Sequence, residues 1–164
     1  MGQYFTASVK RGAMYYAIIS IVFGIISFLL GIAIVIVPPI AFLACLSLPL
    51  MCIAAVAIPI GIGWFVAQWG SATDMAKGAM DGAIACGVGG LIAGAVNWVL
   101  GICSGLATYF LVTSALGGDM VSTLIGSVGG GLLSWIGGAI FAAISGAVGG
   151  LLYVAIQGNK GKPA

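Results

Sequence analysis

The sequence predicts an all-α membrane protein in which four transmembrane helices form one antiparallel bundle, a single domain over residues 1–164. First, 62% of its residues are hydrophobic and only 5% are charged, whereas soluble domains carry about 25% charged residues. Second, no charge interrupts residues 12–73, 82–118 or 120–159. Because a span needs roughly 20 apolar residues to cross about 30 Å of hydrocarbon, the first stretch holds two spans and each later one holds one.

The first span is predicted over residues 14–37, and it ends at Pro38 and Pro39, which interrupt helical hydrogen bonding. Its apolar run is too long for the core of a secretory signal peptide. Residues 38–51 are too hydrophobic for a solvated loop and too short to cross. They form either a re-entrant or interfacial segment, or an extension of the second span kinked at Pro49.

The second span is predicted over residues 52–69. Its last residues include Trp64 and Trp69, which is typical of the aromatic belt at a bilayer surface. Asp74, Lys77 and Asp81 follow at helical spacing on one face. We interpret them as a solvated first turn, with a cation site or a lipid-headgroup contact as functional alternatives.

The third and fourth spans are predicted over residues 82–116 and 121–156, joined by the short turn 117–120, so they should be antiparallel neighbours. Each stretch would be on the order of 50 Å long if fully helical, which exceeds the hydrocarbon thickness. The spans must therefore tilt, protrude or break. The glycines at which we expect a break are Gly101, Gly105, Gly129–Gly131 and Gly137–Gly138.

The basic residues predict the orientation of the chain. With four spans, all five fall on the side that holds both termini and the middle loop, and the opposite side carries only Asp119. By the positive-inside rule the protein is a multi-pass protein of the cell membrane with cytoplasmic N- and C-termini. The net charge of +2 is too small to indicate a nucleic-acid partner. The five residues are Lys10, Arg11, Lys77, Lys160 and Lys162.

Small residues recur at every fourth position in the last two spans. In lipid, helices associate by close approach, and small residues allow it. The stripes therefore predict close packing between spans three and four, or between two protomers. The stripe of span three consists of Gly78, Gly82, Cys86, Gly90 and Gly94. The stripe of span four consists of Gly126, Gly130, Ser134, Gly138, Ala142, Gly146 and Gly150.

Chemically active side chains are scarce. The chain has no His and no Glu, and no Asp lies in the middle of a span, so we expect no enzyme activity, no metal and no cofactor. The four cysteines are too scattered for a metal site. A disulfide among Cys45, Cys52 and Cys103 is left open.

Asn97 is the most polar group near the middle of a predicted span, and its amide needs partners in hydrocarbon. One interpretation is an interhelical hydrogen bond. The other is a pore-lining or ligand-contacting role, together with Ser104 and Thr108 further along the same helix.

The order of elements has a parallel among known proteins. An aliphatic first hairpin turns at prolines, the second span ends in residues 64–69, and the segment 74–83 precedes a Gly-rich pair of spans. This order resembles small Gly-rich four-span archaeal membrane proteins of unknown function. The resemblance implies a topology and no activity.

We therefore expect a structural or accessory subunit, embedded in the lipid bilayer, that packs through its glycine stripes against itself or against other membrane subunits. The alternative is a small oligomeric channel or passive transporter that uses the polar line of Asn97, Ser104 and Thr108.

Overall fold

The computed structural model consists of four long helices, and it describes residues 6–37, 41–113, 117 and 119–157, without the side chains of 35, 41–48 and 112–113. All four helices are long and apolar enough to cross a membrane, and the described residues contain no strand, which confirms the predicted all-α class. The helices are α1 (Ala7–Ile36), α2 (Ala41–Trp69), α3 (Met75–Thr108), which the π-helical segment η2 (Tyr109–Thr113) continues, and α4 (Met120–Gln157).

The helices begin earlier than the predicted spans. α1 starts at Ala7 instead of residue 14, and the side chain of Thr6 accepts a hydrogen bond from the Val9 amide at this end. Residues 41–51 belong to α2, which continues through Pro49 and Pro59. Residues 38–40 and 114–116 lie outside the described part of the chain.

The glycines of α3 and α4 do not interrupt their helices. α3 continues through Gly101 and Gly105, and α4 runs unbroken over 38 residues. Glycine keeps its backbone donor and acceptor, and in lipid the intrahelical bond is the best partner for both. At 1.5 Å per residue α4 is about 57 Å long, so it exceeds the hydrocarbon thickness without a break.

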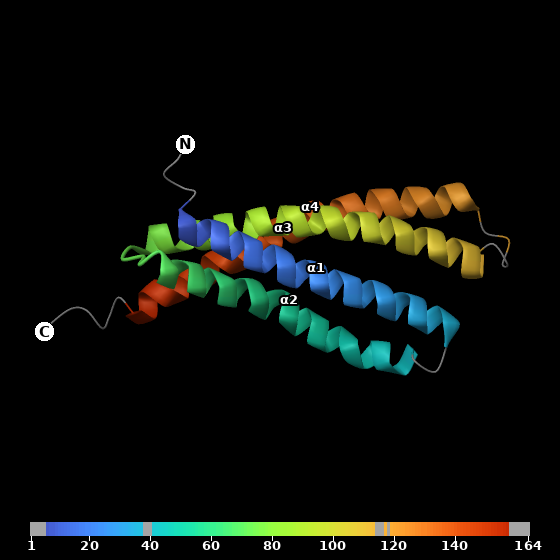
Figure 1. Ribbon diagram of the computed structural model, residues 1–164, viewed down its shortest axis with the longest axis horizontal. Helices are drawn as coiled ribbons and strands as arrows, with labels where there is room; N and C mark the ends of the chain where they lie inside the picture. Colours follow the sequence, from blue (N-terminus) through green and yellow to red (C-terminus); the bar gives the residue numbers. More distant parts are fainter. Residues whose placement is uncertain (1–5, 38–40, 114–116, 118, 158–164) are drawn as a thin grey trace, which may run out of the picture.

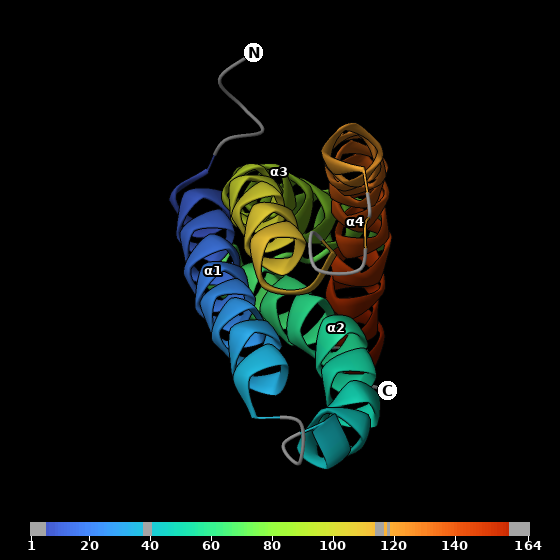
Figure 2. The same ribbon diagram turned by 90° about the vertical axis from the view of Figure 1, so that its right-hand side faces the viewer.

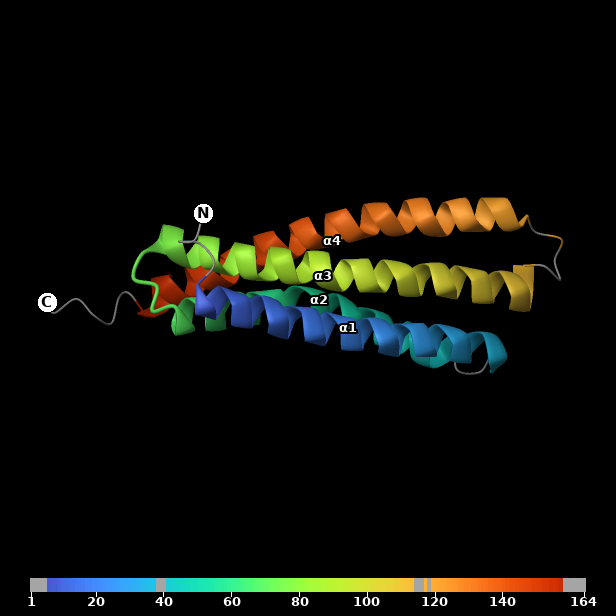
Figure 3. The same ribbon diagram turned by 45° about the horizontal axis from the view of Figure 1, so that its top comes forward.

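The four helices lie close together at one end and fan apart toward the other (Figures 1 and 3). At the closed end α1 and α3 begin and α2 and α4 end, and Figure 2 looks along the bundle from the open end. All buried residues of the described part lie near the closed end. They fall within residues 8–17, 59–72, 78–93 and 139–154.

The core at the closed end is built from small side chains. Gly12 leaves room for Val66, because a Cβ atom on Gly12 would overlap a methyl group of that valine. In lipid, this close approach of helices replaces the hydrophobic effect as the source of stability. The buried core cluster consists of Val9, Ile62, Val66, Ala85, Cys86 and Ala142.

Candidate functional site

At the closed end, α3 and α4 touch through their glycine backbones. A Cβ atom on Gly150 would overlap the Gly78 carbonyl, and one on Gly82 would overlap the Gly146 carbonyl. A Cβ atom on Gly146 would lie 2.5 Å from the Gly82 oxygen. No larger residue fits at these positions without separating the two helices.

The remaining α3 stripe residues also contact α4. Cys86 is fully buried, lies against Gly146, and donates its thiol hydrogen to the carbonyl oxygen of Pro59 on α2 at 3.4 Å. Further along, a Cβ atom on Gly90 would lie 3.2 Å from the Cα atom of Ala139, and Gly94 lies against the indole of Trp135. The structure thus brings the whole α3 stripe against α4.

The stripe on α4 divides in two. Ala142, Gly146 and Gly150 are buried, whereas Ser134 is exposed and nothing lies within 4 Å of a Cβ atom placed on Gly126, Gly130 or Gly138. A four-residue step turns a helix by about 400°, so a strict stripe drifts by about 40° per step. A step of three after Ala139 reduces this drift in the observed contacts. The α4 residues that lie against α3 in this way are Ser127, Gly131, Trp135, Ala139, Ala142, Ala143, Gly146, Gly150 and Val154.

The open half of α4 exposes a second small-residue surface. Gly126, Gly130 and Gly137 are exposed, with open space where a side chain would be. At about 100° per residue, the three lie within roughly 40° of one another around the helix. We call these three residues the glycine face of α4.

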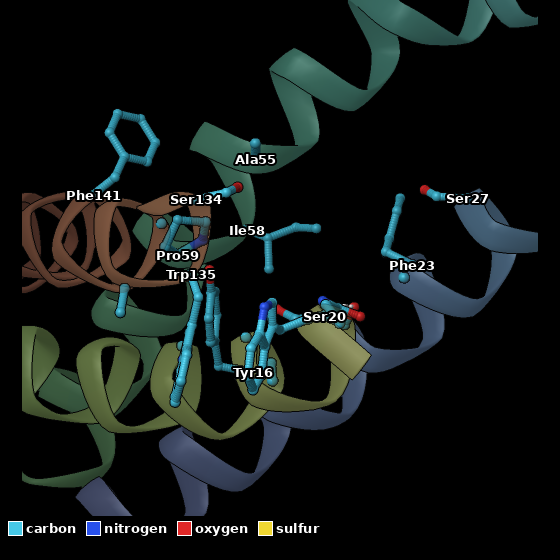
Figure 4. A pocket seen from close by; sticks show the side chains of 18 of the residues that line it. Tyr16, Ser20, Phe23, Ser27, Ala55, Ile58, Pro59, Ser134, Trp135 and Phe141 are labelled. Carbon is cyan, nitrogen blue, oxygen red and sulfur yellow. Dashed lines mark hydrogen bonds between the residues drawn. The ribbon is translucent and has the colours of Figure 1, made fainter. Parts of the chain in front are cut away.

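A cleft of about 590 Å³ lies where the helices begin to separate, and all four helices line it. Figure 4 shows its walls, with Tyr16, Ser20, Phe23 and Ser27 on one side and Trp135 on another. The volume falls within the range of about 300–1,000 Å³ that is typical of small-molecule sites.

Two tryptophans form part of the cleft wall. Trp98 and Trp135 stack with their ring centroids 6.0 Å apart and their planes at 19°. Their indole N–H groups donate to the main-chain oxygens of Val128 at 3.2 Å and Leu91 at 2.9 Å. Both rings are therefore fixed by hydrogen bonds that tie α3 to α4.

Asn97 lines the same cleft and joins α3 to α1. Its Nδ2 donates to the main-chain oxygen of Ser20 at 3.4 Å, and this carbonyl can only accept, which fixes the orientation of the amide. The Oδ1 atom lies against Gly24, is buried, and has no hydrogen-bond partner among the residues that the structure describes. Ser104 and Thr108 do not line the cleft. The structure therefore separates Asn97 from the rest of the predicted polar line.

Asp81 differs from the sequence interpretation. Asp74 and Lys77 are exposed as expected for a solvated turn, but Asp81 is only 4% exposed. Its Oδ2 has no hydrogen-bond partner within the described part of the chain. Ser8 and Gly70 lie beside it, since a Cβ atom on Gly70 would be 3.2 Å from Ser8 Oγ and 3.4 Å from Asp81 Oδ2. The solvated-turn interpretation is wrong for Asp81, because the start of α1 covers this side of α3.

Only some of the cysteines and lysines discussed above lie in the described part of the chain. Cys52 and Cys103 carry free thiols. The side chain of Cys45 and the residues Lys160 and Lys162 lie outside the described part of the chain.

Compared with known proteins, the sequence and structure match no protein family, no curated protein and no solved structure.

Proposed function

We propose that the protein is a structural membrane subunit that associates with a second copy of itself through the glycine face of α4. The closed end would hold the chain together as an antiparallel, glycine-packed bundle. The open half of α4 would remain available for assembly. The unoccupied space at Gly126, Gly130 and Gly137 carries this proposal.

Glycines inside a helix need a physical reason. Each one destabilises a helix by roughly 0.5–1 kcal/mol relative to alanine. At Gly146 and Gly150 a close backbone contact offsets this cost, because no side chain would fit there. On the glycine face, no contact from the described part of the chain offsets this cost. A contact with a neighbouring helix would supply the missing stabilisation.

A second copy suits this face because small residues are needed on both sides of a close helix crossing. In a two-fold symmetric dimer each copy presents the same surface, so Gly126 and Gly130 would meet their own counterparts. Leu133 lies on the same side of α4 and is 74% exposed. It would fill the groove that the glycines of the other copy leave open.

The charges support an orientation in the membrane. Lys10, Arg11 and Lys77 lie in helices that begin at the closed end, whereas Asp119 precedes α4 at the open end. We infer that the closed end faces the cytoplasm, in accordance with the positive-inside rule.

The oligomeric state tests this proposal. Native mass spectrometry from mild detergent should give a dimer for the wild type and a monomer for Gly130→Leu and Gly137→Leu. Gly138→Leu and Gly31→Leu are matched controls, because both positions also have open space but lie off the glycine face. Both controls should remain dimeric.

A wild-type monomer, or equal effects of all four substitutions, would contradict the proposal. A stable complex with a different membrane protein, without self-association, would show that the partner is another subunit and not a second copy.

A further inference from the structure

We propose that the cleft binds one uncharged single-chain lipid that carries an acceptor oxygen, such as an ester or a hydroxyl group. This inference does not depend on the proposed dimer, because the cleft and the glycine face of α4 have no residue in common.

The size of the cleft fits one small molecule such as a single lipid chain. Its volume of about 590 Å³ lies within the range of about 300–1,000 Å³ that is typical of sites for single small molecules.

The lining residues indicate that the ligand is neutral. No Asp, Glu, Lys or Arg is among them. A charged group in this apolar surrounding would have no counter-charge, and its burial would be strongly unfavourable. The phosphate of an ordinary phospholipid is excluded from the cleft by the same argument.

Asn97 indicates an acceptor oxygen on the ligand. An Asn amide has two N–H hydrogens, and the bond to the Ser20 oxygen uses only one. The other side of the amide is closed, since Oδ1 is buried against Gly24. The group of Asn97 that remains for a ligand is therefore a hydrogen-bond donor, the second hydrogen on Nδ2.

As a purely structural link Asn97 is poor, because its one bond is 3.4 Å long and its acceptor is left unpaired. A ligand oxygen that accepts from the second Nδ2 hydrogen would give this amide a second hydrogen bond. The hydroxyls of Ser20, Ser27 and Ser134 around the cleft can also donate to such an oxygen.

Tryptophan fluorescence can measure this binding directly. Trp98 and Trp135 line the cleft, and replacing Trp64 and Trp69 by Phe leaves them as the only tryptophans. The probe is the methyl ester of a dibrominated sixteen-carbon fatty acid, because bromine quenches indole fluorescence on contact. Titrated into detergent micelles that contain the protein, it should quench saturably at one molecule per chain.

Two comparison probes test the ligand class. A dibrominated sixteen-carbon alkane lacks the acceptor oxygen and should bind about tenfold more weakly, which is about 1.4 kcal/mol. The fatty-acid anion carries a charge and should bind more weakly than the ester. Asn97→Leu, which has a similar shape, should lower the affinity for the ester to that for the alkane and leave alkane binding unchanged.

Neighbouring glycines provide the matched control for the site. Gly138 lines the cleft and Gly137 does not, and both have open space for a side chain. Gly138→Leu should weaken ester binding at least tenfold, and Gly137→Leu should leave it unchanged. Gly101→Leu places a side chain in the cleft from α3 and should act like Gly138→Leu.

Equal quenching in Gly137→Leu and Gly138→Leu would show random collisions within the micelle and would overturn the site. Equal affinity for ester and alkane, or for ester and anion, would overturn the ligand class. The dimer is tested separately, by the effect of Gly137→Leu on the mass of the complex. The cleft is tested by the effect of Gly138→Leu on fluorescence quenching.

Discussion

The contact between Gly82 on α3 and Gly146 on α4 predicts a measurable loss of stability for Gly146→Ala. The new methyl carbon would lie 2.5 Å from the Gly82 oxygen and 2.7 Å from the Cys86 sulfur. An ordinary contact between carbon and a carbonyl oxygen is about 3.3–3.6 Å long. The two helices would therefore have to separate by about 1 Å, and this would weaken the adjoining contact at Gly150.

The size of the effect follows from two opposing terms. Overpacking of a tight interior costs about 1–3 kcal/mol. Alanine stabilises a helix by roughly 0.5–1 kcal/mol relative to glycine. The midpoints of these two ranges give a fall of about 1 kcal/mol in the free energy of unfolding of Gly146→Ala. In Gly137→Ala the methyl group meets no atom of the described residues, so only the stabilising effect of alanine on the helix applies.

Steric trapping in detergent gives the free energy of unfolding of each variant relative to wild type. It should be measured at a protein concentration low enough to keep the chain monomeric, so that dimer formation does not enter the comparison. We expect Gly146→Ala to be less stable than wild type and Gly137→Ala to be at least as stable. If Gly146→Ala equals or exceeds Gly137→Ala in stability, the close backbone contact does not exist.

Three further substitutions probe other parts of the molecule. Asp81→Asn should raise the thermal midpoint at neutral pH, because it removes the charge of a buried side chain whose Oδ2 has no hydrogen-bond partner among the described residues. The exposed-site control Asp74→Asn should not raise it. Trp135→Phe should lower the free energy of unfolding by about 1 kcal/mol, since the 2.9 Å bond to α3 is lost; an unchanged value would mean that this bond contributes nothing. Asp119 accepts a hydrogen bond from the Ser122 amide at 3.1 Å, so Asp119→Ala should speed hydrogen exchange of that amide, and Asp119→Asn, which keeps the cap, should not.

The helices were predictable because lipid imposes a simple requirement. In a membrane, the backbone N–H and C=O groups of a long uncharged stretch find their hydrogen-bond partners within a helix. The number of helices therefore follows from the lengths of these stretches. The ends were less predictable. The predicted first span begins at residue 14, after Lys10 and Arg11, whereas α1 begins at Ala7 and includes both residues. A helix end tolerates such residues because their long side chains can extend toward a polar surface.

The sites were harder to predict because they depend on how each helix is rotated about its axis and on contacts with residues distant in the sequence. Spacing alone predicted the α3 stripe, but which half of the α4 stripe is covered depends on how the helices separate. Asn97 stood out by its polarity. The contact between Asn97 and Gly24 could not be predicted, because the two residues lie far apart in the sequence. The burial of Asp81 did leave a local signal, since it lies next to Gly82 in a run of small residues that pack against other helices.

Cysteine cross-linking along α4 in native membranes tests the central claim most directly. In a background without native cysteines, single cysteines at Gly126, Gly130 and Gly137 should form disulfide-linked dimers under mild oxidation. Val128 and Leu132 are also exposed but lie about 160° around the helix from Gly130, so cysteines there should not cross-link. Equal cross-linking on both sides of α4, or none at the glycine face, would contradict the account.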